Sequence, residues 1–175
     1  MIDDHFHDSC GVFGIFAPGH DVARLTFFGL YALQHRGQES AGIAVADDGQ
    51  VTVIKELGLV NQAFKESTLQ SLSGQHAIGH VRYSTTGSTQ WQNSQPLARA
   101  RNGHVIALGH NGNLVNTTEL REELLGRGVK FSSATDTEVI TALIAEQAEG
   151  DFLGSVRTAV SKIRGAFSAT LCSGR

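Results

Sequence analysis

The stretch Ser-Cys-Gly-Val-Phe-Gly-Ile at residues 9–15 places Cys10 at the head of an apolar run with β-branched and aromatic side chains. Such a run, ended by Pro18-Gly19, predicts a β-strand over residues 11–17. The cysteine therefore stands where a strand begins, close to the start of the chain. It is either a small buried hydrophobic group or a reactive nucleophile.

Removal of residues 1–9 would make Cys10 an amino terminus and would place a nucleophile and a base in one residue. An α-amino group titrates near pKa ~8 and a thiol near ~8.5, so the amine can accept a thiol proton around neutral pH. N-terminal threonine enzymes use their amine in this way, whereas an internal amide nitrogen cannot accept the proton. Position alone does not decide between the two interpretations.

Outward from this strand, the pattern continues with strands and then changes to helices. Asp21 caps a helix with apolar residues at helical spacing, and the turn sequence Asp47-Asp48-Gly49-Gln50 predicts a hairpin between two strands. Strands are predicted at 42–46, 51–55, 76–82, 104–110 and 166–172, and helices at 22–33, 117–125, 136–148 and 153–163. This order predicts an α+β layered sandwich.

The polar connection over residues 83–103 is long for a structureless loop, so we expect a binding loop there. The sequence stops at Arg175, soon after the last predicted strand, and leaves little to pack against that strand. We therefore expect a piece of a longer protein, truncated at the C-terminus.

Composition excludes several classes of protein. The 175 residues, 41% of them hydrophobic, suffice for one compact core or for much of a larger domain. A formal charge of −3 gives no basic field for nucleic acid. No apolar stretch approaches the ~20 residues that cross a bilayer, and residues 1–9 do not resemble a signal peptide. We expect a cytoplasmic protein that binds neither nucleic acid nor membrane.

The two cysteines, Cys10 and Cys172, do not form the pattern of a secreted disulfide framework, and a bridge between them is weakly supported. The segment Asp3-Asp4-His5-Phe6-His7-Asp8 contains zinc-type ligands, but its spacing matches no common structural zinc site. We expect no metal or cofactor in this chain.

Arg82 stands where a predicted strand meets a Ser/Thr-rich turn that contains Thr85. A guanidinium there can hold a carboxylate through two parallel hydrogen bonds, while hydroxyls satisfy the remaining oxygen lone pairs. This suggests a site for a small acidic ligand. A phosphate, or an ion pair with a surface acid of the protein itself, would use the same arginine.

Asn111 and Gly112 follow the strand predicted at 104–110. The Asn111 amide can donate a hydrogen bond, and Gly112 can present its backbone N–H without an obstructing Cβ, so together they can form an oxyanion hole. Asn-Gly is also favoured in hairpin turns, which is the simpler interpretation.

Thr135 and Glu138 predict a capping box at the start of a helix, with Asp136 in the first turn, where negative charge is favourable. These features explain the segment without any function. In the functional interpretation, the Asp136 carboxylate holds a ligand's ammonium group.

Residues 34–42, Gln-His-Arg-Gly-Gln-Glu-Ser-Ala-Gly, form a dense polar stretch between a helix and a strand, and a polar helix end is its default interpretation. His35, His80 and His110 lie beside the candidate segments. Any of them could pair with a thiol as in Cys–His enzymes, and the sequence favours none of them as the base.

Five segments, in this order, resemble the glutamine-hydrolysing domain of the amidophosphoribosyltransferase family. This family belongs to the class II glutamine amidotransferases of the N-terminal-nucleophile hydrolase superfamily. The matching segments are residues 10–15, 33–43, 80–87, 110–114 and 135–138. Each is weak alone, but five in series over nearly the whole chain are highly specific.

The resemblance implies a four-layer αββα sandwich over residues 10–175, behind a propeptide at residues 1–9. It further implies that Cys10, once it is the amino terminus, attacks the side-chain amide of glutamine with its own amine as base. Asn111 and Gly112 then stabilise the tetrahedral oxyanion.

The resemblance also assigns the rest of the substrate. Arg82 would hold the α-carboxylate of glutamine, with Thr85 assisting, and Asp136 would hold the α-ammonium. One carboxylate, one ammonium and one amide thus each receive a different partner.

For a whole protein of this family, the resemblance implies that ammonia passes to a second domain and aminates phosphoribosyl pyrophosphate, in the first step of purine biosynthesis. It implies inhibitory purine nucleotides, a homo-oligomer, Mg²⁺ and, in some members, a 4Fe-4S cluster on cysteines outside this chain. The motif for phosphoribosyl pyrophosphate is absent here, so this chain would hydrolyse glutamine at most.

Two alternatives stay open. One is another class II amidotransferase, such as the glucosamine 6-phosphate synthases, although residues 34–40 and 82–85 resemble the purine-pathway family more. The other is a catalytically silent glutamine-binding module in which residues 1–9 still block Cys10.

Overall fold

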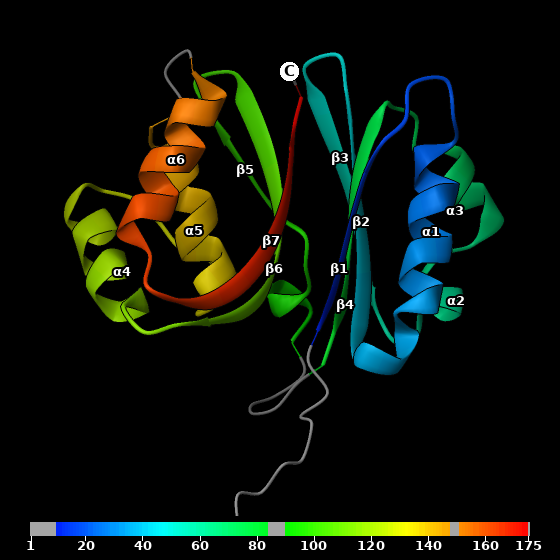
Figure 1. Ribbon diagram of the computed structural model, residues 1–175, viewed down its shortest axis with the longest axis horizontal. Coiled ribbons are helices and arrows are strands. Elements are labelled where there is room, and N and C mark those ends of the chain that lie inside the picture. Colours follow the sequence, from blue (N-terminus) through cyan, green and yellow to red (C-terminus); the bar gives the residue numbers. More distant parts are fainter. Residues whose placement is uncertain (1–9, 84–89, 148–150, 175) are drawn as a thin grey trace, which may run out of the picture.

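Two antiparallel sheets lie face to face, and each carries helices on its outer side (Figure 1). The computed structural model describes residues 10–83, 90–147 and 151–174. Its four layers run helix, sheet, sheet, helix, which confirms the αββα sandwich that we expected.

The first sheet has the strand order β1-β4-β2-β3. Its strands are β1 (Gly11–Phe16), β2 (Ser40–Asp47), β3 (Gln50–Leu57) and β4 (His76–Arg82). The predicted β2–β3 hairpin is confirmed, and its turn residues Asp48 and Gly49 both have positive φ angles, of 34° and 84°. Two left-handed residues match the right-handed twist of the flanking strands.

The second sheet has the order β5-β6-β7. Its strands are β5 (Leu97–Arg101), β6 (His104–Leu114) and β7 (Gly165–Ser173). The prediction of one long loop over residues 83–103 was wrong, because β5 and the 3₁₀ helix η2 (Trp91–Asn93) lie within it. β5 is a short edge strand with two arginines, so its apolar signal is weak. The Asn102-Gly103 turn that joins it to β6 was the usable sign.

The outer helices form two groups (Figure 1). The group on the first sheet is α1 (Val22–Ala32), α2 (Val60–Ala63) and α3 (Glu66–Gln70). The 3₁₀ helix η1 (Gln34–Arg36) directly follows α1 in the chain. The group on the second sheet is α4 (Thr117–Gly126), α5 (Asp136–Ala145) and α6 (Phe152–Lys162). The four predicted helices are confirmed, while α2 and α3 are too short to show a period.

Larger apolar side chains pack between each sheet and its own helices, whereas most of the buried apolar side chains between the sheets are small. That inner cluster consists of Ala44, Ala46, Ile78, Ala107 and Cys172. Small side chains bring the two sheets close together, so polar groups on facing strands can come within hydrogen-bonding distance. This close approach positions the site described below.

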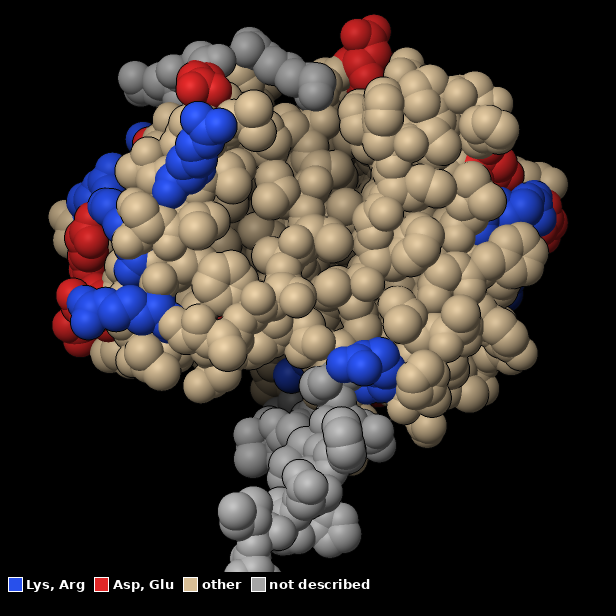
Figure 2. All heavy atoms as spheres, viewed as in Figure 1, with Lys and Arg blue, Asp and Glu red and all other residues tan. Residues whose placement is uncertain are grey.

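In the described residues, no helix is long and apolar enough to cross a membrane. On the face drawn in Figure 2, the charged side chains lie mainly toward the two helical sides of the molecule, and other residues cover the middle. This distribution leaves no continuous basic surface on that face.

Candidate active site

The candidate residues meet at one end of the sandwich. Cys10 immediately precedes β1, and the antiparallel pairing of Gly11 with Val81 places it beside Arg82 at the end of β4. β4 also contacts β6 of the second sheet, which carries Asn111 and Gly112. Residues from three strands that are distant in sequence thus lie together.

The half-buried Cys10 has polar neighbours on both its thiol and its carbonyl. The backbone N–H of Tyr83 donates to Cys10 Sγ at 3.4 Å, and Sγ lies 3.6 Å from the Tyr83 carbonyl oxygen. The carbonyl oxygen of Cys10 accepts from Asn111 Nδ2 at 2.6 Å and from Arg36 Nε at 3.4 Å. The Asn111 amide donor is therefore hydrogen-bonded to the same residue that carries the thiol.

Asn111 and Gly112 lie inside β6, so the hairpin-turn interpretation was wrong. The strand continues to Leu114 because β7 supplies a partner, with Asn111 opposite Ser168 and Gly112 opposite Phe167. Gly112 has a φ of 139°, and a Cβ built there would lie 2.3 Å from the Ala166 carbonyl oxygen. Only glycine fits this position.

Arg82 forms an ion pair within the protein, as one interpretation of this arginine predicted, but its partner Glu39 is largely buried and is not a surface acid. Its Nη1 lies 2.6 Å from Glu39 Oε1, and the side chains are 16% and 9% exposed. This contact occupies one of the five guanidinium N–H groups. Thr85, the expected helper, lies outside the described residues.

Asp136 begins α5 and joins it to the end of β6. Its Oδ2 accepts from the Leu114 backbone N–H at 2.9 Å, and its Oδ1 accepts from Thr117 Oγ1 at 2.7 Å. Each carboxylate oxygen has a second lone pair, so the group can still accept from a ligand.

The cap of α5 differs in part from the prediction. Thr135 Oγ1 accepts from the Glu138 N–H at 3.3 Å, as expected, but the Glu138 carboxylate binds the backbone N–H groups of Ser132 and Ser133. The predicted capping box is therefore only half formed. Burial acts to raise the pKa of Glu138, but the donors from Ser132 and Ser133 outweigh it and lower that pKa.

None of the three candidate histidines contacts the Cys10 thiol in the residues that the structure describes. His35 is exposed, with Nδ1 3.1 Å from the Ala32 carbonyl. His80 is fully buried between the sheets, where its Nε2 lies 3.1 Å from the His110 carbonyl and burial lowers its pKa to about 3. Burial also lowers the pKa of His110. These environments do not provide a base for the thiol.

Both cysteines are free, so the weakly supported bridge is absent. Burial raises the pKa of the Cys172 thiol to about 12. Within residues 10–83, 90–147 and 151–174, no three His, Cys, Asp or Glu side chains could hold a metal ion. The segment at residues 3–8 and the expected propeptide lie outside the described residues.

Sequence reasoning missed three contributors to this end of the sandwich: Arg36 and Tyr83, which contact Cys10, and Glu39, which pairs with Arg82. Arg36 and Glu39 belong to the polar stretch at residues 34–42, which we interpreted as a helix end. The density of charged groups immediately before a buried strand was the available signal.

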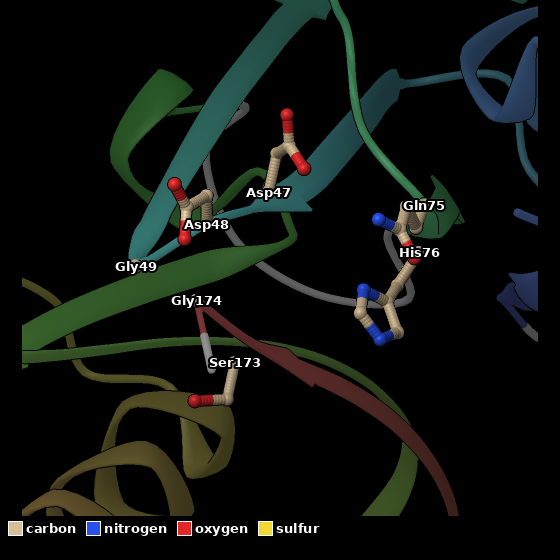
Figure 3. A pocket seen from close by; sticks show the side chains of 7 residues that line it. All are labelled: Asp47, Asp48, Gly49, Gln75, His76, Ser173 and Gly174. Atoms are coloured by element: carbon tan, nitrogen blue, oxygen red, sulfur yellow. The ribbon is translucent and has the colours of Figure 1, made fainter.

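A cavity of about 390 Å³ lies at the end of the sandwich opposite to Cys10, where β2 ends and β4 begins (Figure 3). Its lining residues are Asp47, Asp48, Gly49, Gln75, His76, Ser173 and Gly174. Since Ser40 pairs with Arg82 at one end of these strands and Ala46 with His76 at the other, the cavity is remote from Cys10.

Comparison with known proteins decides the family. A family model described as a glutamine amidotransferase domain matches residues 80–175, more than half of the chain. The chain belongs to this glutamine amidotransferase family. The amidotransferase domain is of the class II kind found in amidophosphoribosyltransferases, as the relatives below show.

The amidophosphoribosyltransferase of Synechococcus elongatus is 53% identical over 96% of this chain, and that of Mycobacterium leprae is 52% identical over 93%. Among solved structures, the Bacillus subtilis glutamine phosphoribosylpyrophosphate amidotransferase complexed with ADP and GMP superposes with a TM-score of 0.78 at 36% identity, over 95% of this chain. A structure described as the allosteric regulatory enzyme of purine biosynthesis gives 0.84 at 39% identity over 93%. The chain spans about a third of the length of each of these proteins.

Proposed function

We propose that this amidotransferase domain hydrolyses glutamine to glutamate and ammonia, with Cys10 as the nucleophile. The observation that carries the proposal is the convergence of Cys10, Asn111 and Arg82 from three strands, with the Asn111 amide 2.6 Å from the Cys10 carbonyl. Packing alone does not require an amide and a half-buried thiol at the same end of the sandwich as a partly buried arginine.

The chemistry begins with removal of residues 1–9, which frees the α-amino group of Cys10. The amine accepts the thiol proton, and the thiolate attacks the side-chain carbonyl carbon of glutamine. Asn111 Nδ2 and the Gly112 N–H stabilise the resulting oxyanion; in other acyl-transfer enzymes, loss of one such donor lowers kcat by about 10²–10³-fold. The carbon–nitrogen bond then breaks as the Cys10 ammonium returns a proton to the departing ammonia.

Glutamate then remains attached to Cys10 as a thioester until water hydrolyses it. Throughout, Arg82 binds the α-carboxylate through N–H groups that Glu39 does not occupy, with Thr85 assisting. Asp136 binds the α-ammonium through its remaining lone pairs. Replacement of either charged residue with alanine should mainly raise KM, and Asp136→Ala should also destabilise the β6–α4 junction that it joins.

In the whole protein, we propose that the ammonia aminates phosphoribosyl pyrophosphate at the start of purine biosynthesis. The relatives named amidophosphoribosyltransferases support this step, and the solved complex with ADP and GMP supports purine nucleotides as regulatory ligands. A homo-oligomer, Mg²⁺ and, in some family members, an iron–sulfur cluster would belong to that larger protein. Free thiols on both cysteines agree with a cytoplasmic location.

The proposal is tested by the intact mass of the purified protein before and after exposure to a glutamine-mimicking diazo-ketone. We expect a chain that begins at Cys10 and gains one covalent adduct. Cys172→Ala, the matched control, should gain the same adduct, and Cys10→Ala should gain none. An unprocessed chain that is not labelled would refute the proposed activity and favour the silent module.

A further inference from the structure

We infer that Glu39 is a positioning residue for Arg82, which it orients toward the α-carboxylate of the amide substrate. The inference rests on the proposed function and extends it to a residue with no assigned role. Glu39 lies immediately before β2, next to the strand end that carries Arg82.

The pair is largely shielded from solvent, but a single hydrogen bond joins the two side chains. Arg82 Nη1 and Glu39 Oε1 are 2.6 Å apart, and Glu39 Oε2 is buried without a hydrogen-bond partner among the described residues. Buried carboxylate oxygens are seldom left unsatisfied, because their desolvation is costly. Two parallel bonds would satisfy both oxygens, so the end-on contact is not the arrangement that stability alone favours.

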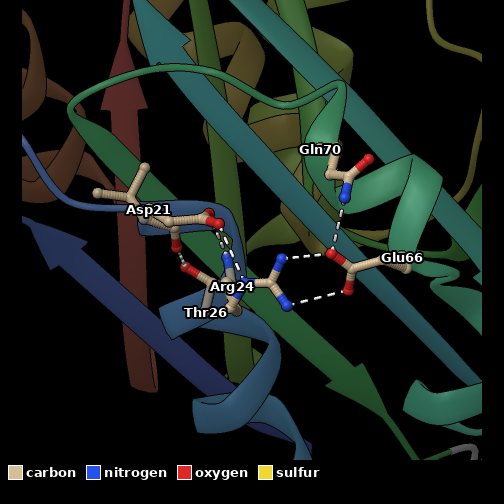
Figure 4. A network of polar contacts seen from close by, with 6 residues as sticks. Asp21, Arg24, Thr26, Glu66 and Gln70 are labelled. Atoms are coloured by element: carbon tan, nitrogen blue, oxygen red, sulfur yellow. Dashed lines mark hydrogen bonds and ion pairs between the residues drawn. The ribbon is translucent and has the colours of Figure 1, made fainter.

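A second arginine–glutamate pair in the protein shows the alternative. In Figure 4, Arg24 binds Glu66 through both terminal nitrogens, at 2.9 Å and 2.5 Å, and this pair is far more exposed. Both terminal nitrogens of Arg24 and both carboxylate oxygens of Glu66 are used in that pair. The end-on contact of Arg82 instead leaves one edge of its guanidinium for a second carboxylate.

The backbone around Glu39 is held firmly against Arg82. The Glu39 N–H donates to the Arg82 carbonyl at 3.0 Å, and a Cβ built on Gly37 would lie within 2.8 Å of three Arg82 backbone atoms. Gln34 fixes the same segment, since its amide donates to the Gly37 carbonyl at 2.5 Å and accepts from the Val60 N–H at 2.7 Å. Glu39 is thus a rigid support on which the longer Arg82 side chain is oriented.

This arrangement predicts how each change at position 39 affects the substrate. Glu39→Ala removes the acceptor, so the Arg82 side chain should gain rotational freedom, and KM for glutamine should rise about tenfold or more with kcat within about threefold. Glu39→Gln keeps an oxygen that accepts from Arg82. It should restore KM to within about threefold of the wild-type value.

The deciding experiment compares two reagents that alkylate Cys10 in the purified protein. The diazo-ketone carries the α-carboxylate and α-ammonium of glutamine, whereas iodoacetamide carries neither. We expect Glu39→Ala to slow labelling by the diazo-ketone about tenfold and to leave the iodoacetamide rate unchanged. The same rates are measured on Glu39→Gln, where both should stay near wild type.

Glu146→Ala is the matched control, because the Glu146 side chain is only 4% exposed and pairs with Arg101 away from the site. It should change thermal stability without changing either labelling rate. If Glu39→Ala slows both reagents equally, Glu39 is merely structural and the inference is overturned. If Glu39→Ala slows neither, Arg82 needs no support and the inference also fails. If the wild-type protein reacts with iodoacetamide but not with the diazo-ketone, the proposed function and this inference fall together.

Discussion

Gly112→Ala tests whether the backbone that presents the proposed oxyanion donor depends on glycine. Gly112 has a φ of 139°, and the added Cβ would lie 2.3 Å from the Ala166 carbonyl oxygen and 2.6 Å from Phe167 Cα. These are backbone atoms of the neighbouring strand, which cannot move away as a flexible side chain can. The substitution therefore disturbs the β6–β7 ladder itself.

The expected magnitude has two sources. An unfavourable φ costs about 1–3 kcal/mol for a residue with a Cβ. Forced overlap in a packed region costs about 1–3 kcal/mol more. We therefore expect Gly112→Ala to lower the free energy of unfolding by about 2–6 kcal/mol, and to abolish glutaminase activity even where the protein still folds.

Two other glycines separate these sources. Gly103 has a φ of 76° with nothing within 4 Å of its built Cβ, so Gly103→Ala should show the backbone strain alone. Gly126, at the end of α4, has the same open space and no positive φ, so Gly126→Ala should be neutral or slightly stabilising. Urea unfolding, followed by the fluorescence of the single tryptophan and by circular dichroism, gives all three free energies. If Gly112→Ala is no more destabilising than Gly103→Ala, the overlap argument is refuted.

Three further predictions concern individual side chains. Asn111→Leu should lower kcat for glutamine about 10²–10³-fold with little change in KM, measured by ammonia release; an unchanged kcat would remove Asn111 from the oxyanion hole. Iodoacetamide at pH 8 should modify Cys10 and spare Cys172, whose pKa burial raises to about 12, and peptide mass mapping of folded and unfolded protein checks this. The unfolded chain protonates His80 below pH ~6.5, whereas burial lowers the pKa of His80 in the folded protein to about 3. The free energy of unfolding should therefore fall as pH falls from 6.5 toward 3, and His80→Gln should reduce that pH dependence. Urea midpoints at pH 7 and 4.5 compare the two proteins. An equal loss of stability in both would contradict the attribution of the pH dependence to His80.

Local patterns predicted most of the fold. In the described residues, alternation, helical spacing and turn residues located six of the seven strands and four of the six α-helices. Asp21 does cap α1, where it accepts from the Arg24 N–H. The misses were β5, α2 and α3, because a short edge strand and helices of one turn carry too few residues to show a period. Their structure comes from contacts with distant segments.

Side-chain partners were the less predictable part of the site. The Asn-Gly sequence at 111–112 fits a turn and an irregular strand equally well. The structure at these residues is decided by pairing with strand β7, some 50 residues later. Likewise, Arg82 could be assigned to a ligand or to an acid of the protein. The structure shows the acid and leaves the ligand as a proposal, since one arginine can serve both.

The contact between Asn111 and Cys10 joins residues 101 positions apart. Asn111 lies in β6 of the second sheet, and Cys10 immediately precedes β1 of the first. No spacing rule reaches that far, because the distance between those atoms depends on how closely the sheets pack. The small residues Ala44, Ala46 and Ala107 set that separation, although none of them belongs to the site. The candidate site therefore lies where the two sheets meet: in the proposed function, the nucleophile and one substrate clamp come from the side of the first sheet, and the oxyanion donors come from the second. This explains why only the ordered series of motifs, rather than any one of them, could identify the chemistry from the sequence.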